Sequence, residues 1–180
     1  MQQILILGGG FAGLWSAAGA ARLLDQRGIA PDKIRVTLVN RDDWHCIRVR
    51  NYEPGLHDVR VPLADVLEPI GVDRIIGDIT EIDLAARQVA CDMGRERKTL
   101  TYDRLVLAIG STLLRPPIPG LVEHGFDIDT YGAAERLQAH IDCWRCESSS
   151  KCTPSDRQRQ NDGAAPRRQQ KIHVHEVEIN

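Results

Sequence analysis

Three glycines near the N-terminus have the spacing of a phosphate-binding turn. Gly8, Gly10 and Gly13 form the pattern G-x-G-x-x-G within ILILGGGFAGLWSA. In such a turn the first glycine permits a tight bend, the second lets a pyrophosphate approach the backbone, and the third lets the following helix pack against the preceding strand. The N–H groups at the start of that helix, here at Phe11 and Ala12, then face the phosphates. The pattern predicts a dinucleotide-binding turn.

The residues that follow the run IRVTLV are candidates for contacts to a ribose. Dinucleotide-binding folds usually place an acidic side chain there for the ribose hydroxyls, but this chain has Asn40 followed by Arg41. An amide oxygen can accept a hydrogen bond, although it cannot make the charge-assisted pair of contacts that a carboxylate makes. Two interpretations of Arg41 stay open, namely a contact to the 2′-phosphate of NADP and a solvent-exposed arginine at a strand end.

The elements that must position these residues follow from the hydrophobic pattern. Residues 3–7 predict a buried parallel strand, because they form a short apolar run that ends in glycines. Residues 11–26 have apolar positions at helical spacing, and Gly28 stands where a C-terminal cap is expected. Residues 34–39 are rich in β-branched side chains and predict a second strand. Together these elements make a βαβ unit of ordinary length.

Beyond this unit the sequence predicts a short helix after Pro62, an antiparallel meander, another buried strand and a final helix. Asp129 or Thr130 would be the N-cap of the final helix. The expected ranges are 63–68 for the short helix, 74–82, 88–91 and 99–102 for the meander, 104–109 for the buried strand and 131–141 for the final helix. The expected fold class is therefore α/β, with a parallel sheet and an inserted antiparallel β-meander.

The composition is that of a globular protein. Of the 180 residues, 42% are hydrophobic and the formal net charge is −2, so no strong overall field indicates nucleic acid or an anionic membrane as a partner. The sequence has no apolar run long enough for a transmembrane helix, and its N-terminus lacks the basic region of a signal peptide. A cytoplasmic protein with reduced thiols is expected.

Residues 143–180 differ from the rest of the chain, because they are polar and rich in Gln, Ser and Arg, without a sustained apolar period. We place a domain boundary at Asp142 and expect a disordered, irregular tail after it. Cys143 and Cys146 form C-x-x-C, but the paired knuckles of a zinc site are missing. A redox motif of the thioredoxin type would precede a helix, whereas Cys143 follows one. No metal site is expected.

Four stretches, taken in order, resemble the FAD-containing pyridine nucleotide–disulfide oxidoreductases, and most of all their type II NADH dehydrogenase-like branch. They are ILILGGGFAGLWSA, VTLVNRDDWHCIRVRNYEPG, IIGDITEID and YDRLVLAIGS. The resemblance covers residues 1–142 and implies a Rossmann-like FAD-binding domain. In that family a hydride passes from NAD(P)H to FAD, and the electrons then pass to a quinone or a similar acceptor.

The resemblance also implies roles for particular residues. The first βαβ unit would bind the ADP part of FAD, and the backbone of Ile79 would contact adenine. Ala108 and Gly110 would close over the cofactor, although Ile109 between them replaces the threonine of the family and removes a hydroxyl. Residues 44–49 would lie along the flavin side, and for His45 and Cys46 within that segment packing is the expected role.

The chain lacks other features of the family that it resembles. Members are longer, with a second G-x-G-x-x-G for NAD(P)H and a Gly-Asp motif that holds the ribitol and pyrophosphate, and neither follows Asp142 here. We therefore expect a truncated FAD-binding portion, weakly active or inactive alone, with no identifiable catalytic residue and no visible NAD(P)H site. A partner chain could supply the missing half. Two alternatives stay open: a non-catalytic nucleotide-binding module, and a truncated gene product without a ligand.

Overall fold

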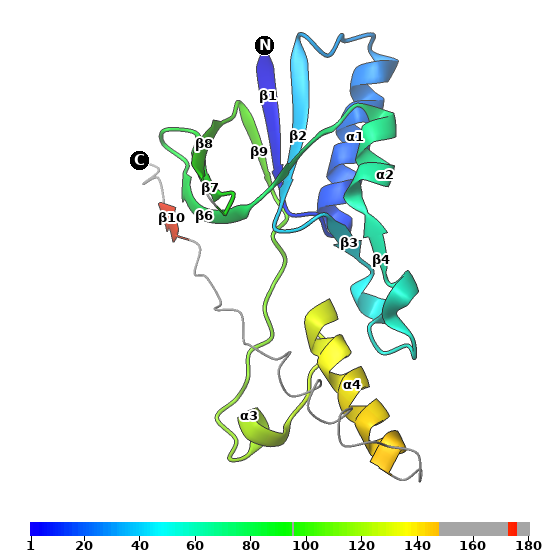
Figure 1. Cartoon of the computed structure of the whole chain (residues 1–180). Coiled ribbons are helices and arrows are strands. Elements are labelled where there is room, and N and C mark those ends of the chain that lie inside the picture. Colours follow the sequence, from blue (N-terminus) through cyan, green and yellow to red (C-terminus); the bar gives the residue numbers. More distant parts are fainter. Residues whose placement is uncertain (95, 148–172, 176–180) are drawn as a thin grey trace. The chain divides into compact units, whose positions relative to one another are not determined.

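The computed structural model describes residues 1–94, 96–147 and 173–175 (Figure 1). The chain divides into two compact units. The first unit comprises Met1–His45, Val61–Gly110 and Gln170–Asn180, and the second comprises Cys46–Arg60 and Ser111–Gln169. All the cofactor-binding residues predicted from the sequence lie in the first unit.

A four-stranded parallel sheet forms the centre of the first unit. Its strands, in the order β5-β2-β1-β9, are β1 (Gln2–Leu7), β2 (Ile34–Asn40), β5 (Asp73–Ile76) and β9 (Arg104–Leu107) (Figure 1). In the register of the sheet, Leu5 lies beside Thr37 on one side and Leu105 on the other. The central strands β1 and β2 are apolar because other elements cover both faces of the sheet. This sheet confirms the predicted α/β class.

Helix α1 (Phe11–Gln26) connects β1 to β2 and covers one face of the sheet together with α2 (Leu63–Leu67) (Figure 1). The buried residues between the helices and the sheet are Ile6, Ala17, Val36, Leu38, Leu63, Leu67 and Val72. Burial of this many apolar side chains is the main source of stability for such a layer. The predicted bounds of the long helix are confirmed.

The end of α1 has the hydrogen bonds of a Schellman cap. Gly28 adopts a φ of +62°, and its N–H donates to the carbonyl of Asp25 at 2.9 Å. The N–H of Ile29 donates to the carbonyl of Leu24 at 3.0 Å. These two bonds satisfy carbonyl groups that the helix itself leaves unpaired, so the predicted capping role of Gly28 is confirmed.

An antiparallel meander covers the other face of the sheet. It consists of β6 (Asp78–Asp83), β7 (Gln88–Asp92) and β8 (Arg97–Thr101), and β10 (His173–His175) adds a parallel strand beside β6. The core between meander and sheet contains Leu5, Leu7, Val39, Ile79, Ile82, Val89, Cys91 and Tyr102. The sequence predicts this meander correctly, but places the start of its first strand wrongly.

The prediction of one strand over residues 74–82 is wrong, because the chain changes sheets at Gly77. Asp73–Ile76 form β5 of the parallel sheet, and only the following strand, β6, belongs to the meander. The N–H of Gly77 donates to the carbonyl of Asn40 at 2.8 Å, and a Cβ at Gly77 would lie 2.5 Å from Cys91 Sγ. A side chain does not fit there, so glycine permits the passage between the two sheets.

The strand predicted over residues 104–109 is shorter and more exposed than expected. It ends at Leu107, whose side chain is 56% exposed, and Ile109 beyond it is 42% exposed. The reason is the position of β9 at one end of the strand order. A strand at the edge of a sheet has a neighbour on one side only, and apolar sequence alone does not reveal this.

The chain also contains several shorter elements. The strands β3 (Trp44–Cys46) and β4 (Arg60–Pro62) pair as a two-stranded sheet. The 3₁₀ helices are η1 (Arg48–Arg50), η2 (Leu56–Asp58) and η3 (Glu68–Ile70). The short helix predicted over 63–68 ends at Leu67 and continues as η3.

The second unit contains α3 (Leu121–His124) and α4 (Tyr131–Glu147). Thr130 is the N-cap of α4, because its Oγ1 accepts a hydrogen bond from the N–H of Ala133 at 3.2 Å. The helix continues to Glu147 instead of ending at Ile141, so it crosses the boundary placed at Asp142. Of the tail beyond it, residues 173–175 form β10, and the expectation for residues 148–172 and 176–180 lies outside the described residues.

Candidate dinucleotide-binding site

The glycine turn begins where β1 ends, and it is held by bonds to both neighbouring strands. The N–H of Gly8 donates to the carbonyl of Val39 at 2.7 Å, and the N–H of Ala108 donates to the carbonyl of Leu7 at 2.8 Å. Gly8 has a φ of +107°, which disfavours any other residue. A Cβ at Gly8 would also overlap the carbonyl oxygen of Ala108. Both facts confirm the tight-bend role predicted for Gly8.

Gly13 brings α1 directly against this bend. A Cβ at Gly13 would overlap the carbonyl oxygen of Gly8, and it would lie 3.6 Å from Ala108 Cβ. The backbone of the helix therefore touches the backbone of the turn, with no space for a side chain between them. The close packing predicted for Gly13 is confirmed, while its contact with a cofactor stays a prediction.

Gly10 is different, because it borders open space. Within the described part of the chain, no atom other than those of Gly10 and its two chain neighbours lies within 4 Å of the position that a Cβ at Gly10 would occupy. Gly10 is the N-cap of α1 in an extended conformation, with φ −74° and ψ −175°, and no side chain of the described residues caps the helix. The exposed first residues, Phe11 and Ala12, carry N–H groups without partners inside the helix. This end of α1 is available to an anion.

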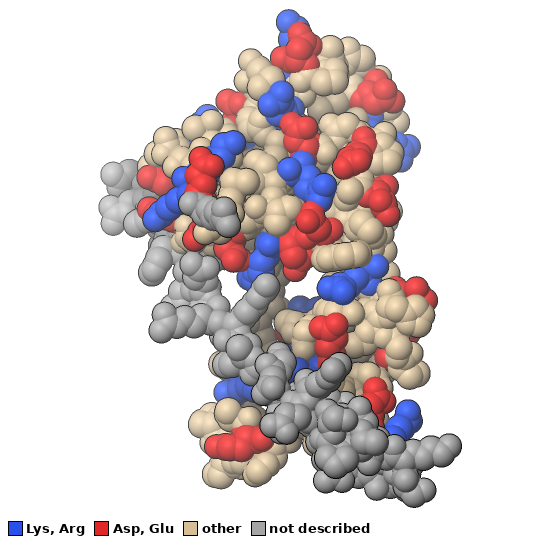
Figure 2. All heavy atoms as spheres, in the orientation of Figure 1, with Lys and Arg blue, Asp and Glu red and all other residues tan. Residues whose placement is uncertain are grey.

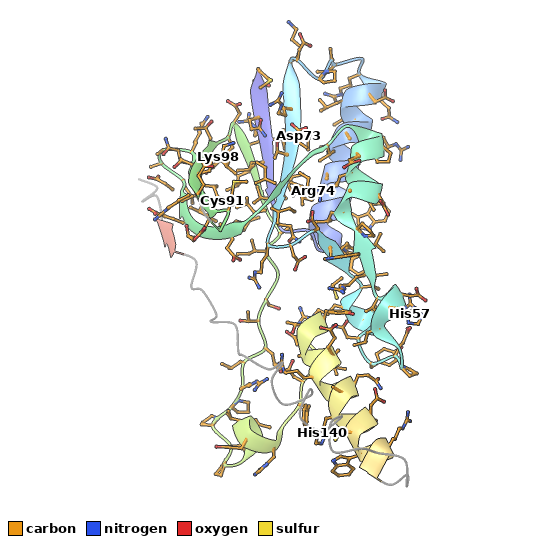
Figure 3. All side chains as sticks on the ribbon, viewed as in Figure 1. His57, Asp73, Arg74, Cys91, Lys98 and His140 are labelled. Atoms are coloured by element: carbon orange, nitrogen blue, oxygen red, sulfur yellow. The ribbon has the colours of Figure 1, made fainter. Side chains whose placement is uncertain are left out.

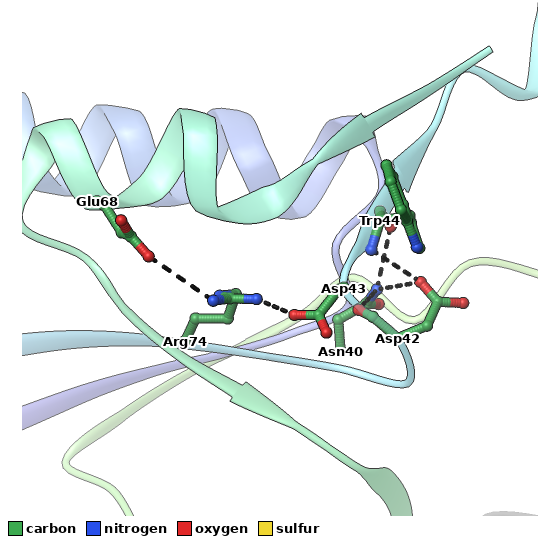
Figure 4. A network of polar contacts seen from close by, with 6 residues as sticks. All are labelled: Asn40, Asp42, Asp43, Trp44, Glu68 and Arg74. Carbon is green, nitrogen blue, oxygen red and sulfur yellow. Dashed lines mark hydrogen bonds and ion pairs between the residues drawn. The ribbon is translucent and has the colours of Figure 1, made fainter. Parts of the chain in front are cut away.

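The side chain of Asn40 turns toward the glycine turn. Its Oδ1 accepts a hydrogen bond from the N–H of Gly9 at 2.8 Å. Its Nδ2 donates to the carbonyl of Asp42 at 2.9 Å and to that of Trp44 at 3.4 Å (Figure 4). One lone pair of Oδ1 is thus engaged already, and a ribose hydroxyl would have to use the other. The ribose contact of Asn40 stays a prediction.

Arg41 is engaged by a carboxylate. Its Nε donates to Oδ1 of Asp78 at 2.9 Å; the Arg41 side chain is largely exposed, whereas that of Asp78 is about half-buried. Asp78 is the first residue of β6, so its proximity to the end of β2 could not be read from the sequence. This pair supports the second of the two interpretations left open for Arg41, a surface arginine at a strand end.

A second network lies beside the first and fixes the loop after β2 (Figure 4). Arg74 pairs with Asp43, and also lies 3.7 Å from Oε1 of Glu68. Asp43 accepts a further contact through its backbone, because the N–H of Leu63 donates to its carbonyl at 2.8 Å. The loop that follows Asn40 is therefore tied to both β5 and α2.

Gly9 belongs to the site but was not predicted from the sequence, and His45 was predicted only to pack; the structure adds a hydrogen bond to this packing role. Gly9 is buried, and a Cβ there would lie 2.8 Å from Asn40 Cγ. His45 is only 4% exposed; its Nδ1 lies 2.8 Å from the carbonyl oxygen of Gly9, and its ring packs edge-on against Phe11 at a centroid distance of 4.7 Å. A carbonyl oxygen only accepts hydrogen bonds, so Nδ1 carries the proton. The run of three glycines was the available signal for Gly9.

The remaining predicted residues occupy different positions around the site. Ile79 lies in β6 with its side chain buried in the core, which leaves its backbone as the only part that could meet adenine. Ala108 follows β9 and touches the turn, as described above. Gly110, with a φ of +74°, is exposed. The cofactor contacts of all three stay predictions.

A polar groove of about 440 Å³ lies between the sheet and the meander, away from the glycine turn. Figure 3 shows Asp73 and Arg74 of β5 on one side of it and Lys98 of β8 on the other. Gln3 and Thr37 form part of its floor, joined by a hydrogen bond of 2.7 Å. Gln3, Asp73 and Arg74 lie near the amino ends of β1 and β5, and Thr37 lies in the middle of β2. α/β folds instead bind ligands at the carboxyl ends of their strands.

Several charged side chains of the first unit form ion pairs with one another. Arg35 pairs with Asp73, Arg41 with Asp78 and Arg97 with Glu81, and Figure 2 shows acidic and basic side chains intermixed on the visible face. In the part of the chain that the structure describes, no group of His, Cys, Asp and Glu could hold a metal ion. None of the described helices is long and apolar enough to cross a membrane.

The parallel sheet, the glycine turn and the inserted meander define a Rossmann-like domain of the class that binds FAD or NAD. The family model named pyridine nucleotide-disulphide oxidoreductase matches residues 2–143, and the chain belongs to this family. The family expected from the four sequence stretches is thereby confirmed.

The chain is also similar in sequence to two curated relatives. The chain is 47% identical over 141 residues to an NADH dehydrogenase-like protein of Mycobacterium tuberculosis. It is 28% identical over 146 residues to a type II NADH:quinone oxidoreductase of Staphylococcus aureus. Each match covers 78% of this chain and 34% of the relative. The chain thus spans about a third of the length of the curated relatives it matches.

Solved structures agree on the fold. The sulfide:quinone oxidoreductase of Aquifex aeolicus has a TM-score of 0.64 and 25% identity, with coverage of 79% of this chain and 32% of the other. A structure of NDH2 from Plasmodium falciparum has a TM-score of 0.65 at 16% identity, with coverage of 86% and 32%. At that identity the second likeness shows the fold alone.

Proposed function

We propose that this chain binds the ADP part of FAD at the glycine turn, as the FAD-binding portion of an NAD(P)H dehydrogenase-like flavoprotein. One observation carries the proposal: among the described residues, no side chain caps the start of α1 and none fills the space beside Gly10. Backbone N–H groups and a partial positive charge meet there, which suits a pyrophosphate. The family and the curated relatives support FAD as the dinucleotide.

In this proposal the backbone does most of the binding. The N–H groups of Gly10, Phe11 and Ala12 bind the pyrophosphate. Asn40 offers its remaining lone pair to the ribose. The residues proposed to border the rest of the ADP part and the cofactor beyond it are Arg41, Ile79, Ala108 and Gly110. The bound FAD supplies the hydride acceptor, while the protein binds and orients it.

Electron transfer from NAD(P)H is proposed only for a complete enzyme of this family. The sequence has one G-x-G-x-x-G pattern, and the chain corresponds to about a third of its curated relatives. We propose that the 180-residue chain alone oxidises NAD(P)H slowly or not at all. A second polypeptide segment, on this or on a partner chain, would hold the nicotinamide in the working enzyme. A cytoplasmic location is proposed with it.

Purified protein tests the proposal. Flavin absorbance near one equivalent per chain, together with stabilisation of the apoprotein by FAD and by ADP, is the expected result. Stabilisation by ADP and NAD without retention of flavin would favour a nucleotide-binding module instead. If FAD, ADP and NAD all leave the melting temperature unchanged, the turn binds no dinucleotide. Rapid bleaching of bound flavin by added NADH would contradict the proposed lack of turnover.

A further inference from the structure

We propose that Asn40 and His45 are positioning residues that hold the two peptide groups on either side of Gly9, so that the N–H of Gly10 points at the pyrophosphate. This inference rests on the proposed function, since it concerns how the same turn is prepared for its ligand. Asn40 is the last residue of β2 and His45 lies in β3, the next strand along the chain. Neither residue needs to touch the cofactor for this role.

The first of these peptide groups joins Gly8 to Gly9. Its N–H donates to Asn40 Oδ1 at 2.8 Å. The described chain has no cis peptide bond, so the carbonyl of Gly8 points in the opposite direction. That carbonyl lies against Gly13, where a Cβ would overlap it. The group is therefore held from both sides, by an amide side chain and by the backbone of α1.

The second peptide group joins Gly9 to Gly10. Its carbonyl accepts a hydrogen bond from His45 Nδ1 at 2.8 Å. Because the group is planar and trans, the N–H of Gly10 points away from His45. The space beside Gly10 is open, as described above. His45 also packs its ring against Phe11, the first residue of α1, so one side chain links the turn to the start of the helix.

The surroundings of Asn40 require an amide at this position. Its Oδ1 faces a donor, whereas its Nδ2 faces the carbonyl oxygens of Asp42 and Trp44 and lies 3.4 Å from Oδ1 of Asp42. An aspartate would place an oxygen opposite these carbonyl oxygens and a second negative charge beside Asp42. Such a group lacks the donor and repels its neighbours. The departure from the usual acidic residue is thus explained by the turn itself.

Asn40→Asp separates the two explanations sharply. If Asn40 served only as a weak ribose contact, a carboxylate would strengthen binding. If Asn40 holds the turn, the variant should raise the Kd for FAD and for ADP about three- to tenfold, the effect of losing one hydrogen bond. Gln88→Glu is the matched control, because it adds the same charge at an exposed position in β7. Its Kd values should equal those of the wild type.

A pair of variants at His45 provides a rescue test. His45→Phe keeps a ring against Phe11 but removes the donor, and it should weaken FAD and ADP binding about three- to tenfold. His45→Asn restores a donor where Nδ1 lies, and it should bring the Kd back close to the wild-type value although the ring is lost. A role in packing alone would give the reverse order of affinities. Titration calorimetry of each full-length variant measures these constants.

Hydrogen exchange of the Gly9 amide tests the inference in the absence of a ligand. In protein labelled with ¹⁵N-glycine, this amide should exchange slowly in the wild type and faster in Asn40→Leu, which lacks the acceptor. The inference would be overturned if Asn40→Asp bound FAD as tightly as the wild type or more tightly. It would also be overturned if His45→Phe and His45→Asn had equal affinities. The proposed function would stand in both cases. Failure of the wild type to bind either FAD or ADP would overturn the proposed function, and this inference with it.

Discussion

Nε of Arg41 lies 2.9 Å from Oδ1 of Asp78, so the first residue of the meander engages the arginine that follows β2. This pair decides how much positive charge the end of β2 can present to a ligand. An arginine without an ion-pair partner would favour binding of a 2′-phosphate there, whereas an arginine paired with a carboxylate attracts a phosphate much less.

Asp78→Asn should therefore release Arg41 toward the ligand. We expect the variant to bind 2′-phospho-ADP more tightly relative to ADP, by about two- to fivefold at low salt, because the gain of an exposed charge contact is modest. The free energy of unfolding should change by less than about 1 kcal/mol, since the lost ion pair is exposed. Parallel titrations with ADP and 2′-phospho-ADP measure the ratio. An unchanged ratio would show that Arg41 does not face the ribose.

Gly13→Ala should be strongly destabilising. A Cβ at this position overlaps the carbonyl oxygen of Gly8, and relief of the overlap requires a shift of backbone, with a cost on the order of 1–3 kcal/mol. Gly19→Ala in the same helix is the matched control, because nothing lies within 4 Å of its Cβ position in the described chain. That change should stabilise the protein by up to about 1 kcal/mol through helix propensity. Urea denaturation of both variants compares them directly.

Gly10→Ala should separate ligand binding from folding. The Cβ meets no described atom and the φ of −74° suits alanine, so the loss of stability should stay near 1 kcal/mol or less, the usual difference at an N-cap. The methyl group would nevertheless occupy the approach of the pyrophosphate. We expect the Kd for FAD to rise at least about tenfold, as measured by flavin fluorescence. Wild-type affinity in this variant would place the pyrophosphate elsewhere.

The stability of the first unit should fall at alkaline pH. Burial, followed by the charges of Asp78 and Asp92, raises the pKa of the Cys91 thiol, and burial likewise raises the pKa of Tyr102. The folded state therefore holds these protons more tightly than the unfolded state. The stabilisation is complete below the unfolded pKa of a thiol, about 8.5, and is lost as the pH rises toward the folded value.

Cys91→Ala tests the thiol part of this dependence. The variant loses some packing at every pH, but the decline of its unfolding free energy between about pH 8 and 10 should be shallower than that of the wild type. Urea titrations at a series of pH values measure the slope. Identical slopes in wild type and Cys91→Ala would contradict the assignment.

The edge of the sheet at β9 should promote self-association. Leu107 is 56% exposed at the end of the last strand in the sheet order, and exposed apolar edge strands are sites of intermolecular pairing. Leu107→Lys should lower the proportion of oligomers in size-exclusion chromatography with light scattering. Leu114→Lys is the matched control, because Leu114 is more exposed still but lies outside any strand. Equal profiles for both variants would exclude the β9 edge as the cause.

Local features of the first unit could be predicted from the sequence. The helix over residues 11–26 and its cap at Gly28 depend on spacing and on glycine conformation within a few residues. The bend at Gly8 and the close approach at Gly13 belong to a pattern whose parts are near one another along the chain. The family followed from the order of four such local patterns.

Long-range relationships could not be predicted in this way. The break at Gly77 depends on Cys91 of β7, and the exposure of β9 depends on its place in the sheet order. The partners of Arg41 and of the Gly9 backbone lie more than thirty residues away along the chain. Composition and periodicity carry no information about such pairs.

The sequence by itself thus determined that a glycine turn connects a strand to a helix, because glycine conformation and hydrophobic periodicity act within a few residues. Only the tertiary structure decided what holds that turn. Asn40 and His45 reach Gly9 because β1 and β2 are neighbours in a parallel sheet, which brings the end of one strand beside the end of the other. Hydrogen bonds need contact in space, and the packing of the sheet creates it.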